Sequence, residues 1–125
     1  VKMLNKSSDG KSKMVFEPSV VKVKVGDTVT FIPTNKSHSV ESLKKDDTRP
    51  KDAEKFKGKV NKKTSYVVQQ EGIHVFKCKP HYAMGMIGMI VAGNPTNLEV
   101  IKNIKIKGKK SKSRFKEMLA SFTAK

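Results

Sequence analysis

The sequence is organised around one short stretch, Cys78-Lys79-Pro80-His81-Tyr82-Ala83-Met84-Gly85-Met86. This stretch contains the only cysteine of the chain, a histidine three residues later and a methionine five residues beyond the histidine. A thiolate, an imidazole and a thioether form a soft ligand set, which suits copper better than magnesium or calcium. One more histidine would complete a trigonal His₂Cys site with a weak axial methionine, and His38 is the candidate. The sequence therefore predicts one type 1 (blue) copper site.

Other readings of these residues are less consistent with their spacing. A lone cysteine is most often a small buried hydrophobe, and a methionine-rich run such as Met84, Met86 and Met89 is more often core filling. Structural zinc sites use paired Cys-x₂₋₄-Cys or His-x₃₋₅-His elements, which the sequence lacks. A cysteine nucleophile needs an orienting group and an oxyanion hole, and Pro80 removes a backbone donor where one would be needed. The spacing Cys-x₂-His-x₄-Met, with a histidine 40 residues upstream of the cysteine, favours copper.

Composition and charge narrow the class of protein. The chain has 125 residues, enough for one domain with one sizeable core. Its 27 lysines and arginines exceed its 11 aspartates and glutamates, and the net charge of +16 predicts an acidic partner. Only two of the basic residues are arginines and no nucleic-acid-reading motif is present, so a protein partner is favoured over nucleic acid.

The sequence also bears on where the protein works. No apolar stretch is long enough to cross a bilayer, so membrane insertion is not expected. The chain begins at Val1 without a signal-peptide pattern, and we interpret it as an exported product whose signal has been removed. The single cysteine excludes an internal disulfide bond.

Short β-branched and alternating runs separated by turns predict an all-β sandwich in residues 1–93. The predicted strands are 14–16, 20–25, 28–32, 64–69, 72–78 and 86–92. In the second of these, Val21, Val23 and Val25 are expected to share one face. His74 shares the parity of Phe76 and Cys78, so we interpret it as an inward-facing structural histidine and not as a ligand.

Residues 94–125 predict a helical extension that packs on the sandwich, which makes residues 1–125 a single domain. A short helix is expected over 95–101, capped by Thr96 or Asn94. After a basic connector at 105–112, Ser113 is expected to cap a second helix. Its apolar face, at helical spacing, comprises Phe115, Met118, Leu119 and Phe122.

With the ligand spacing and the strand order in view, the chain resembles the cupredoxins, and within them the pseudoazurins. The resemblance covers nearly the whole chain, including the two C-terminal helices. It rests on the residues quoted above for the loop and on further stretches: Gly26-Asp27-Thr28-Val29-Thr30-Phe31-Ile32-Pro33, Met14-Val15-Phe16-Glu17-Pro18, Val40-Glu41-Ser42 and Ala53-Glu54-Lys55-Phe56-Lys57. The implied fold is a Greek-key β-sandwich with two C-terminal α-helices.

The resemblance also implies roles for individual residues. His38, Cys78 and His81 would be the equatorial copper ligands and Met86 the axial ligand, whereas Met84 would not bind the metal. The ligands would be surrounded by Met14, Ser39, Lys79 and Pro80. The partner would dock on Lys36, Lys57, Lys77, Lys79, Ala83 and Met84. Ser39 and Lys79 stand where relatives usually carry asparagine and threonine, so the rigidity of the loop is expected to differ.

The function implied by the resemblance is electron transfer rather than catalysis. The chain would be a monomeric periplasmic carrier that takes single electrons from a cytochrome or similar donor. It would pass them to an acidic reductase of denitrification, typically a copper nitrite reductase. The alternative is a periplasmic copper-delivery protein, which would bind Cu(I) at exposed, easily exchanged methionine and cysteine ligands. A third alternative is a basic module that binds nucleic acid or a membrane. Binding of stoichiometric copper would exclude it.

Overall fold

Two four-stranded β-sheets and a helical layer make up the computed structural model, which describes the backbone of residues 1–123 and the side chains of residues 1–121. The first sheet has the order β2-β1-β4-β6 and the second has the order β3-β8-β7-β5. The strands are β1 (Lys2–Lys6), β2 (Lys13–Glu17), β3 (Val20–Val23), β4 (Thr28–Pro33), β5 (Glu41–Ser42), β6 (Thr64–Val67), β7 (Gly72–Lys77) and β8 (Ile87–Ala92). β1 pairs with β4 and β3 pairs with β8 in parallel, and the other pairs are antiparallel. The prediction of a β-sandwich is confirmed.

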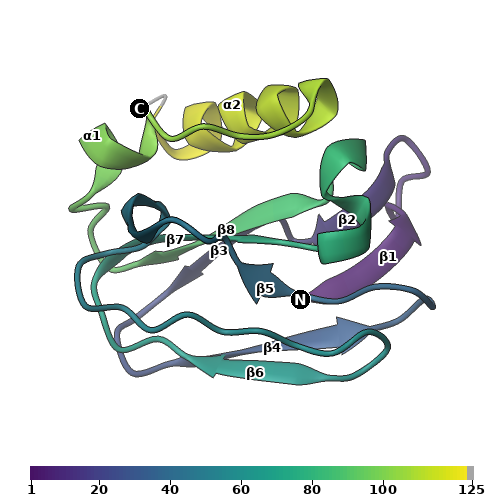
Figure 1. Cartoon of the computed structure of the whole chain (residues 1–125), viewed down its shortest axis with the longest axis horizontal. Coiled ribbons are helices and arrows are strands. Elements are labelled where there is room, and N and C mark those ends of the chain that lie inside the picture. Colours follow the sequence, from purple (N-terminus) through teal and green to yellow (C-terminus); the bar gives the residue numbers. More distant parts are fainter. Residues whose placement is uncertain (124–125) are drawn as a thin grey trace.

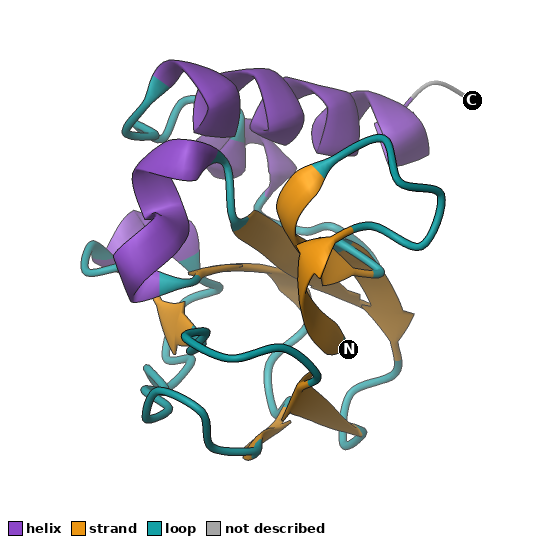
Figure 2. Cartoon of the chain, turned by 90° about the vertical axis from the view of Figure 1, so that its right-hand side faces the viewer, coloured by secondary structure: helices purple, strands orange, loops and turns teal. Residues whose placement is uncertain are grey.

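The helices cover the second sheet on the side away from the first, so that the molecule has three layers (Figure 1). They are α1 (Leu98–Ile101) and α2 (Lys109–Thr123), and two short 3-10 helices, η1 (Asp46–Thr48) and η2 (Lys79–Met84), lie in the loops. The turned view shows α2 running across the top of the strands, with η2 beneath one of its ends (Figure 2).

The second sheet is buried on both faces, and this explains the composition of β7 and β8. One face contributes Phe76, Cys78, Met86 and Ile90 to the core between the sheets. The other face packs Ile73, Val75, Ile87, Met89 and Val91 under the helices. A strand covered on both sides favours apolar residues on both faces, which is why these two strands are mostly apolar rather than alternating.

His74 lies in this buried sheet as a structural residue. Its side chain is 1% exposed. Its Nε2 is 2.9 Å from the carbonyl oxygen of Gln70, and its Nδ1 is 3.2 Å from the hydroxyl of Tyr66 on the opposite sheet. Burial lowers the pKa of His74, against the opposing effect of the Gln70 carbonyl. The prediction of an inward-facing, hydrogen-bonded histidine is confirmed.

Several predicted details of the strands are wrong. β1 and β5 were not predicted, because β1 has one fully buried side chain, Met3, among exposed lysines and β5 has only two residues. β3 ends at Val23, so Val25 does not share the inward face and is 50% exposed. The chain turns instead at Gly26, whose φ of 99° disfavours other residues, and Asp27 accepts a hydrogen bond from the Lys24 N–H.

The predicted helix caps are also wrong. Neither Thr96 nor Asn94 caps α1: the cap residue is Asn97, and its side chain makes no capping bond. The Asn97 amide instead binds both the N–H and the carbonyl of Ile73 on β7, at 2.7 and 3.0 Å. Ser113 caps nothing, because α2 begins at Lys109, inside the predicted connector.

The predicted apolar face of α2 is confirmed as far as the described side chains allow. Phe115 and Met118 are each 5% exposed in the core beneath the helices, and Leu119 packs against the same core. The side chain of Phe122 lies outside the described residues.

Candidate metal centre

The loop between β7 and β8 presents the predicted ligands because the two strands close it tightly. The Cys78 N–H donates to the Met86 carbonyl at 3.0 Å, and the Met86 N–H donates to the His81 carbonyl at 3.2 Å. Between them, η2 is broken at His81, whose ψ of 17° departs from helical geometry. The loop therefore turns through one short kinked helix and returns Met86 beside Cys78 in the ladder.

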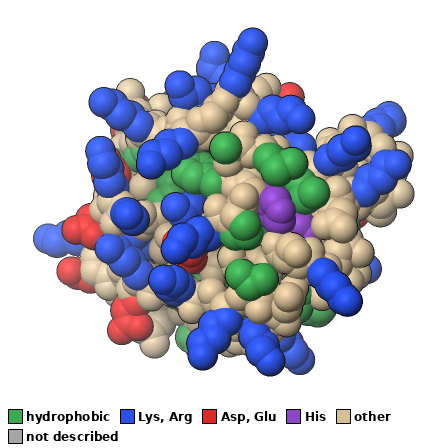
Figure 3. Space-filling model, turned by 45° about the vertical axis from the view of Figure 1, so that its right-hand side comes forward, with side chains coloured by type: hydrophobic (Ala, Val, Ile, Leu, Met, Phe, Trp, Pro, Cys, Tyr) green, Lys and Arg blue, Asp and Glu red, His purple; other side chains and the backbone are tan. Residues whose placement is uncertain are grey.

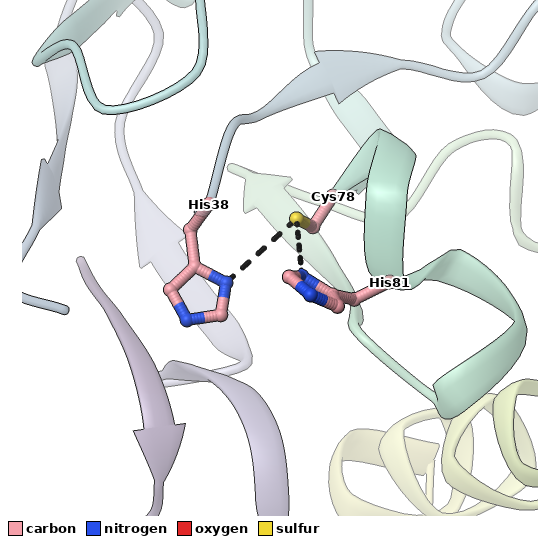
Figure 4. A group of neighbouring side chains, drawn as sticks. All are labelled: His38, Cys78 and His81. Atoms are coloured by element: carbon pink, nitrogen blue, oxygen red, sulfur yellow. Dashed lines mark hydrogen bonds between the residues drawn. The ribbon is translucent and has the colours of Figure 1, made fainter. Parts of the chain in front are cut away.

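His38 comes from a different part of the chain, before β5, and its ring faces the same sulfur (Figure 4). The Cys78 Sγ is 3.9 Å from Nδ1 of His38 and 3.4 Å from Nδ1 of His81. All three ligand atoms lie within 4.8 Å of one another. Two ligand atoms at about 2.0–2.3 Å from one ion would lie roughly 3.1–4.0 Å apart at angles between 100° and 120°. The three side chains therefore fit around a single metal ion.

The orientation of His38 is set by a hydrogen bond on the far side of its ring. Its Nε2 lies 2.6 Å from Oδ1 of Asn5 on β1. Because an amide oxygen can only accept, the Nε2 atom donates and carries the proton, which leaves the lone pair of Nδ1 facing the sulfur. Burial, and the neighbouring His81, lower the pKa of His38 and favour the neutral imidazole that binds metals.

The thiol of Cys78 is fully buried. Burial raises the pKa of the Cys78 thiol, because the thiolate loses its hydration, while the N–H of Ser39 at 3.4 Å from Sγ works in the opposite direction. A metal ion would take the place of the thiol proton and supply the positive charge that the buried sulfur lacks. Met86 is also 0% exposed and belongs to the same core as Cys78. The donor set is therefore soft, dry and suited to copper.

The residues predicted to surround the ligands are less well defined by the structure than the ligands themselves. Ser39 contacts Cys78 through its backbone, as above. Met14 is half-buried against the core between the sheets. Lys79 and Pro80 are exposed at the start of η2. The core beside Met14 contains Cys78 and Met86, and the influence of Met14, Lys79 and Pro80 on the metal stays a prediction.

The predicted docking residues are exposed or half-buried. Lys36, Lys57, Lys79, Ala83 and Met84 are exposed. Lys77 is half-buried, with its Nζ 4.9 Å from the centre of the Tyr82 ring. A histidine reaches the surface there among apolar side chains, with lysines around them (Figure 3). It is His81, since His38 and His74 are at most 1% exposed.

Arg114 on α2 is a residue near the centre that the sequence did not suggest. Its guanidinium donates to the carbonyls of Met14 at 2.8 Å, Gly85 at 2.7 Å and Lys13 at 2.7 Å. Gly85 directly precedes Met86 and has φ of 96°, and a Cβ added there would lie 2.9 Å from the Arg114 Nη1. The glycine is therefore required both by the turn and by the close approach of the arginine.

Comparison with known proteins agrees with this geometry. Residues 1–93 match the family model of copper binding proteins of the plastocyanin/azurin family. The chain is 41% identical over 121 residues to a pseudoazurin from Paracoccus pantotrophus, covering 96% of this chain and 80% of that protein. The chain belongs to the pseudoazurin family. A putative pseudoazurin from Rhizobium leguminosarum is 49% identical over 107 residues, covering 85% of this chain and 68% of that protein.

Solved structures extend the match to the helical layer. A pseudoazurin structure from Sinorhizobium meliloti superposes with a TM-score of 0.90 at 43% identity, covering 97% of this chain and 92% of the other. As a member of the pseudoazurins, the chain is a copper electron carrier of cupredoxin fold, with one type 1 copper as its cofactor.

Replacement of Arg114 by methionine, which keeps the length but removes the donors, tests its link to the metal loop. The carbonyls of Met14 and Gly85 would lose a partner in a half-buried position. We expect the free energy of unfolding of the copper-free protein to fall by about 1–3 kcal/mol. Hydrogen exchange of the Met86 amide should accelerate. Urea unfolding and exchange measured by NMR would show both effects. Lys110→Met, at an exposed position of the same helix, is the control, and an equal loss there would contradict the role of Arg114.

Proposed function

We propose that His38, Cys78 and His81 are the equatorial ligands of the copper and that Met86 is the axial ligand. The observation that carries this assignment is the convergence of two imidazole Nδ1 atoms and one thiol sulfur within 4.8 Å. Met86 is preferred to Met84 because it is fully buried in the core that contains Cys78, whereas Met84 is 44% exposed. Both the position of the ligands and their chemistry favour this set.

The protein's contribution to electron transfer is to keep these ligands in place. When bound, the copper supplies a one-electron couple, Cu(II)/Cu(I). His38 is held by Asn5 on the rigid sandwich, and the loop ligands are held by the pairing of β7 with β8. A pocket fixed from two sides allows little movement of the ligands between the two redox states, and the burial of Cys78 and Met86 excludes water. His81, the half-buried ligand, leads from the interior to the surface.

The surface around His81 is the proposed site of electron exchange. The loop exposes Ala83 and Met84 as apolar surface. The predicted docking lysines are Lys36, two residues before His38, and Lys57, Lys77 and Lys79, which line one groove together with Tyr82 of the loop. An exposed apolar patch commonly marks a docking site. Redox encounters are small and transient, so the lysines would mainly raise the rate of association with an acidic partner.

We further propose that the chain works in the periplasm as a monomer and is not an enzyme. Its acceptor would be an acidic reductase such as a copper nitrite reductase, and its donor a cytochrome or a similar carrier. Support comes from the family and from the charge of +16. Among the described residues, no helix has the length and apolar character needed to pass through a bilayer. The alternative of copper delivery needs exposed ligands, and both Cys78 and Met86 are 0% exposed.

The variant Cys78→Ser tests the copper site directly. The oxidised protein should bind one copper per chain and show an intense thiolate-to-copper absorption band. A hydroxyl cannot replace the soft thiolate, so the band should disappear in Cys78→Ser. Met84→Leu, which removes the neighbouring thioether, is the control and should retain the band. A visible absorption spectrum of each copper-loaded variant is sufficient, and a band that survives in Cys78→Ser would refute the assignment.

The variant Met86→Gln tests the axial ligand. An amide oxygen is a harder donor than a thioether and favours Cu(II), so the reduction potential should fall while the colour remains. Potentiometric titration of this variant beside Met84→Gln separates the two methionines. If only Met84→Gln lowered the potential, Met86 would not be the axial ligand.

Charge reversal tests the docking surface. Exposed charges farther than about 8 Å from the partner are largely screened at physiological ionic strength. Lys36→Glu or Lys77→Glu should therefore lower the second-order rate of electron transfer to the acidic partner by about tenfold at low salt. Lys110→Glu, on α2, should have a smaller effect. The same smaller effect is predicted for Lys125, which lies outside the described residues. Stopped-flow kinetics against salt would measure the rates, and equal losses at Lys36 and Lys110 would contradict a local docking surface.

A further inference from the structure

A groove of about 1330 Å³ lies outside the metal centre, between the segment from β5 to η1 and the helical layer. One wall carries Lys44 and Lys45, and the opposite wall carries Lys102, Lys105 and Lys107 of the connector that leads into α2. In Figure 3, part of this region appears as an apolar patch bordered by lysines, beside the surface histidine. The groove adjoins the proposed docking site and shares Lys57, Lys77 and Lys79 with it, while its other seven lysines lie outside that site.

The lining of the groove is far richer in lysine than the chain as a whole. Ten of its twenty lining residues are lysines, compared with 25 of 125 in the whole sequence. Only two lining residues, Glu41 and Asp47, are acidic. The like charges of these lysines repel one another across the groove. An anionic ligand would relieve this repulsion.

The floor of the groove is apolar. Leu43, Ile106 and Phe115 are nearly buried beneath it, whereas Tyr82 and Ile104 are half-buried and retain accessible surface. A ligand that only neutralised charge would leave this apolar surface in water. The combination of lysine walls and an apolar floor fits a ligand that carries both anionic and apolar groups.

Internal hydrogen bonds hold both walls in place. The guanidinium of Arg49 donates to the Leu43 carbonyl at 2.8 Å and pairs with Asp46 at 2.8 Å, which fixes the wall near η1. On the other side, the Lys107 N–H donates to the Tyr82 hydroxyl at 3.2 Å, and the Ser111 hydroxyl donates to the Tyr82 carbonyl. A groove that is already formed costs less conformational entropy when a ligand binds.

We propose that this groove binds an acidic amphipathic peptide segment of a partner protein. Ten lysines exceed what the single headgroup of a fatty acid could match. A flat bilayer does not reach the floor of a concave groove, and the lining contains no arginine to read nucleic acid. A peptide with several carboxylates and a few leucines matches both the walls and the floor. The interaction does not require the copper, so it adds a contact to the electron-transfer surface and does not depend on the ligand assignment.

Fluorescence anisotropy with a synthetic peptide tests the proposal. The probe is a fluorescein-labelled 12-residue peptide with four glutamates and four leucines, titrated with copper-loaded and with copper-free protein. We expect equal affinity for the two forms. Lys102→Glu combined with Lys105→Glu should weaken binding by at least about tenfold, as should replacement of the leucines of the peptide by serine. The matched control is Lys22→Glu with Lys24→Glu, two exposed lysines of the β3 region outside the groove, which should change the affinity much less.

A second variant separates the floor from the charge. Ile104→Ser removes apolar surface without changing the charge. It should also lower the affinity for the peptide, while the reduction potential of the copper stays unchanged. Equal losses in the two double-lysine variants would mean that the peptide senses only the overall charge, and the proposal would fall. It would also fall if the serine peptide bound as tightly as the leucine peptide. Stronger binding of a 12-residue oligothymidylate, or of anionic vesicles at matched charge, would likewise overturn the peptide assignment.

Discussion

The antiparallel pairing of β7 with β8 is the constraint on which the metal centre depends. The register that places Lys77 opposite Ile87 leaves Cys78 and Met86 as the next residues along, and their backbones bond at 3.0 Å. The side chains of Cys78 and Met86 lie in the core between the sheets, where both are 0% exposed. His38 completes the cluster from the opposite side.

The helical layer reinforces this arrangement from outside. α2 covers the apolar face of β8 through Phe115 and Met118, and it reaches the loop at two further points. Ser111 binds the Tyr82 carbonyl, and Arg114 binds the Gly85 carbonyl. The loop is therefore braced by the sandwich on one side and by the helix on the other. This explains why an element far from the ligands in sequence is part of the same structural unit.

The surface around His81 and the adjoining groove differ in shape, although lysines border both. Around His81 the lysines border a small apolar patch, which suits a brief encounter with a redox partner. Beside it the lysines line a concave groove with an apolar floor, which suits an inserted chain segment. Because Lys57, Lys77 and Lys79 belong to both, a partner with a redox centre and an acidic tail would contact the two as one continuous surface. Binding of the tail would raise the effective concentration of the partner near His81.

The sequence by itself determined the features that depend on local spacing. Cys78, His81 and Met86 were recognisable because they share one loop, and His74 was placed inward by strand parity alone. Tertiary structure decided the rest. Asn5 forms a hydrogen bond with His38, 33 residues away, because β1 pairs in parallel with β4. No pattern in the lysine-rich sequence of β1 predicts this pairing. Arg114 meets Met14 across 100 residues, and the groove exists only where the connector faces η1. Periodicity reports which face of an element is buried, but which other element covers that face is decided by the packing of the whole chain.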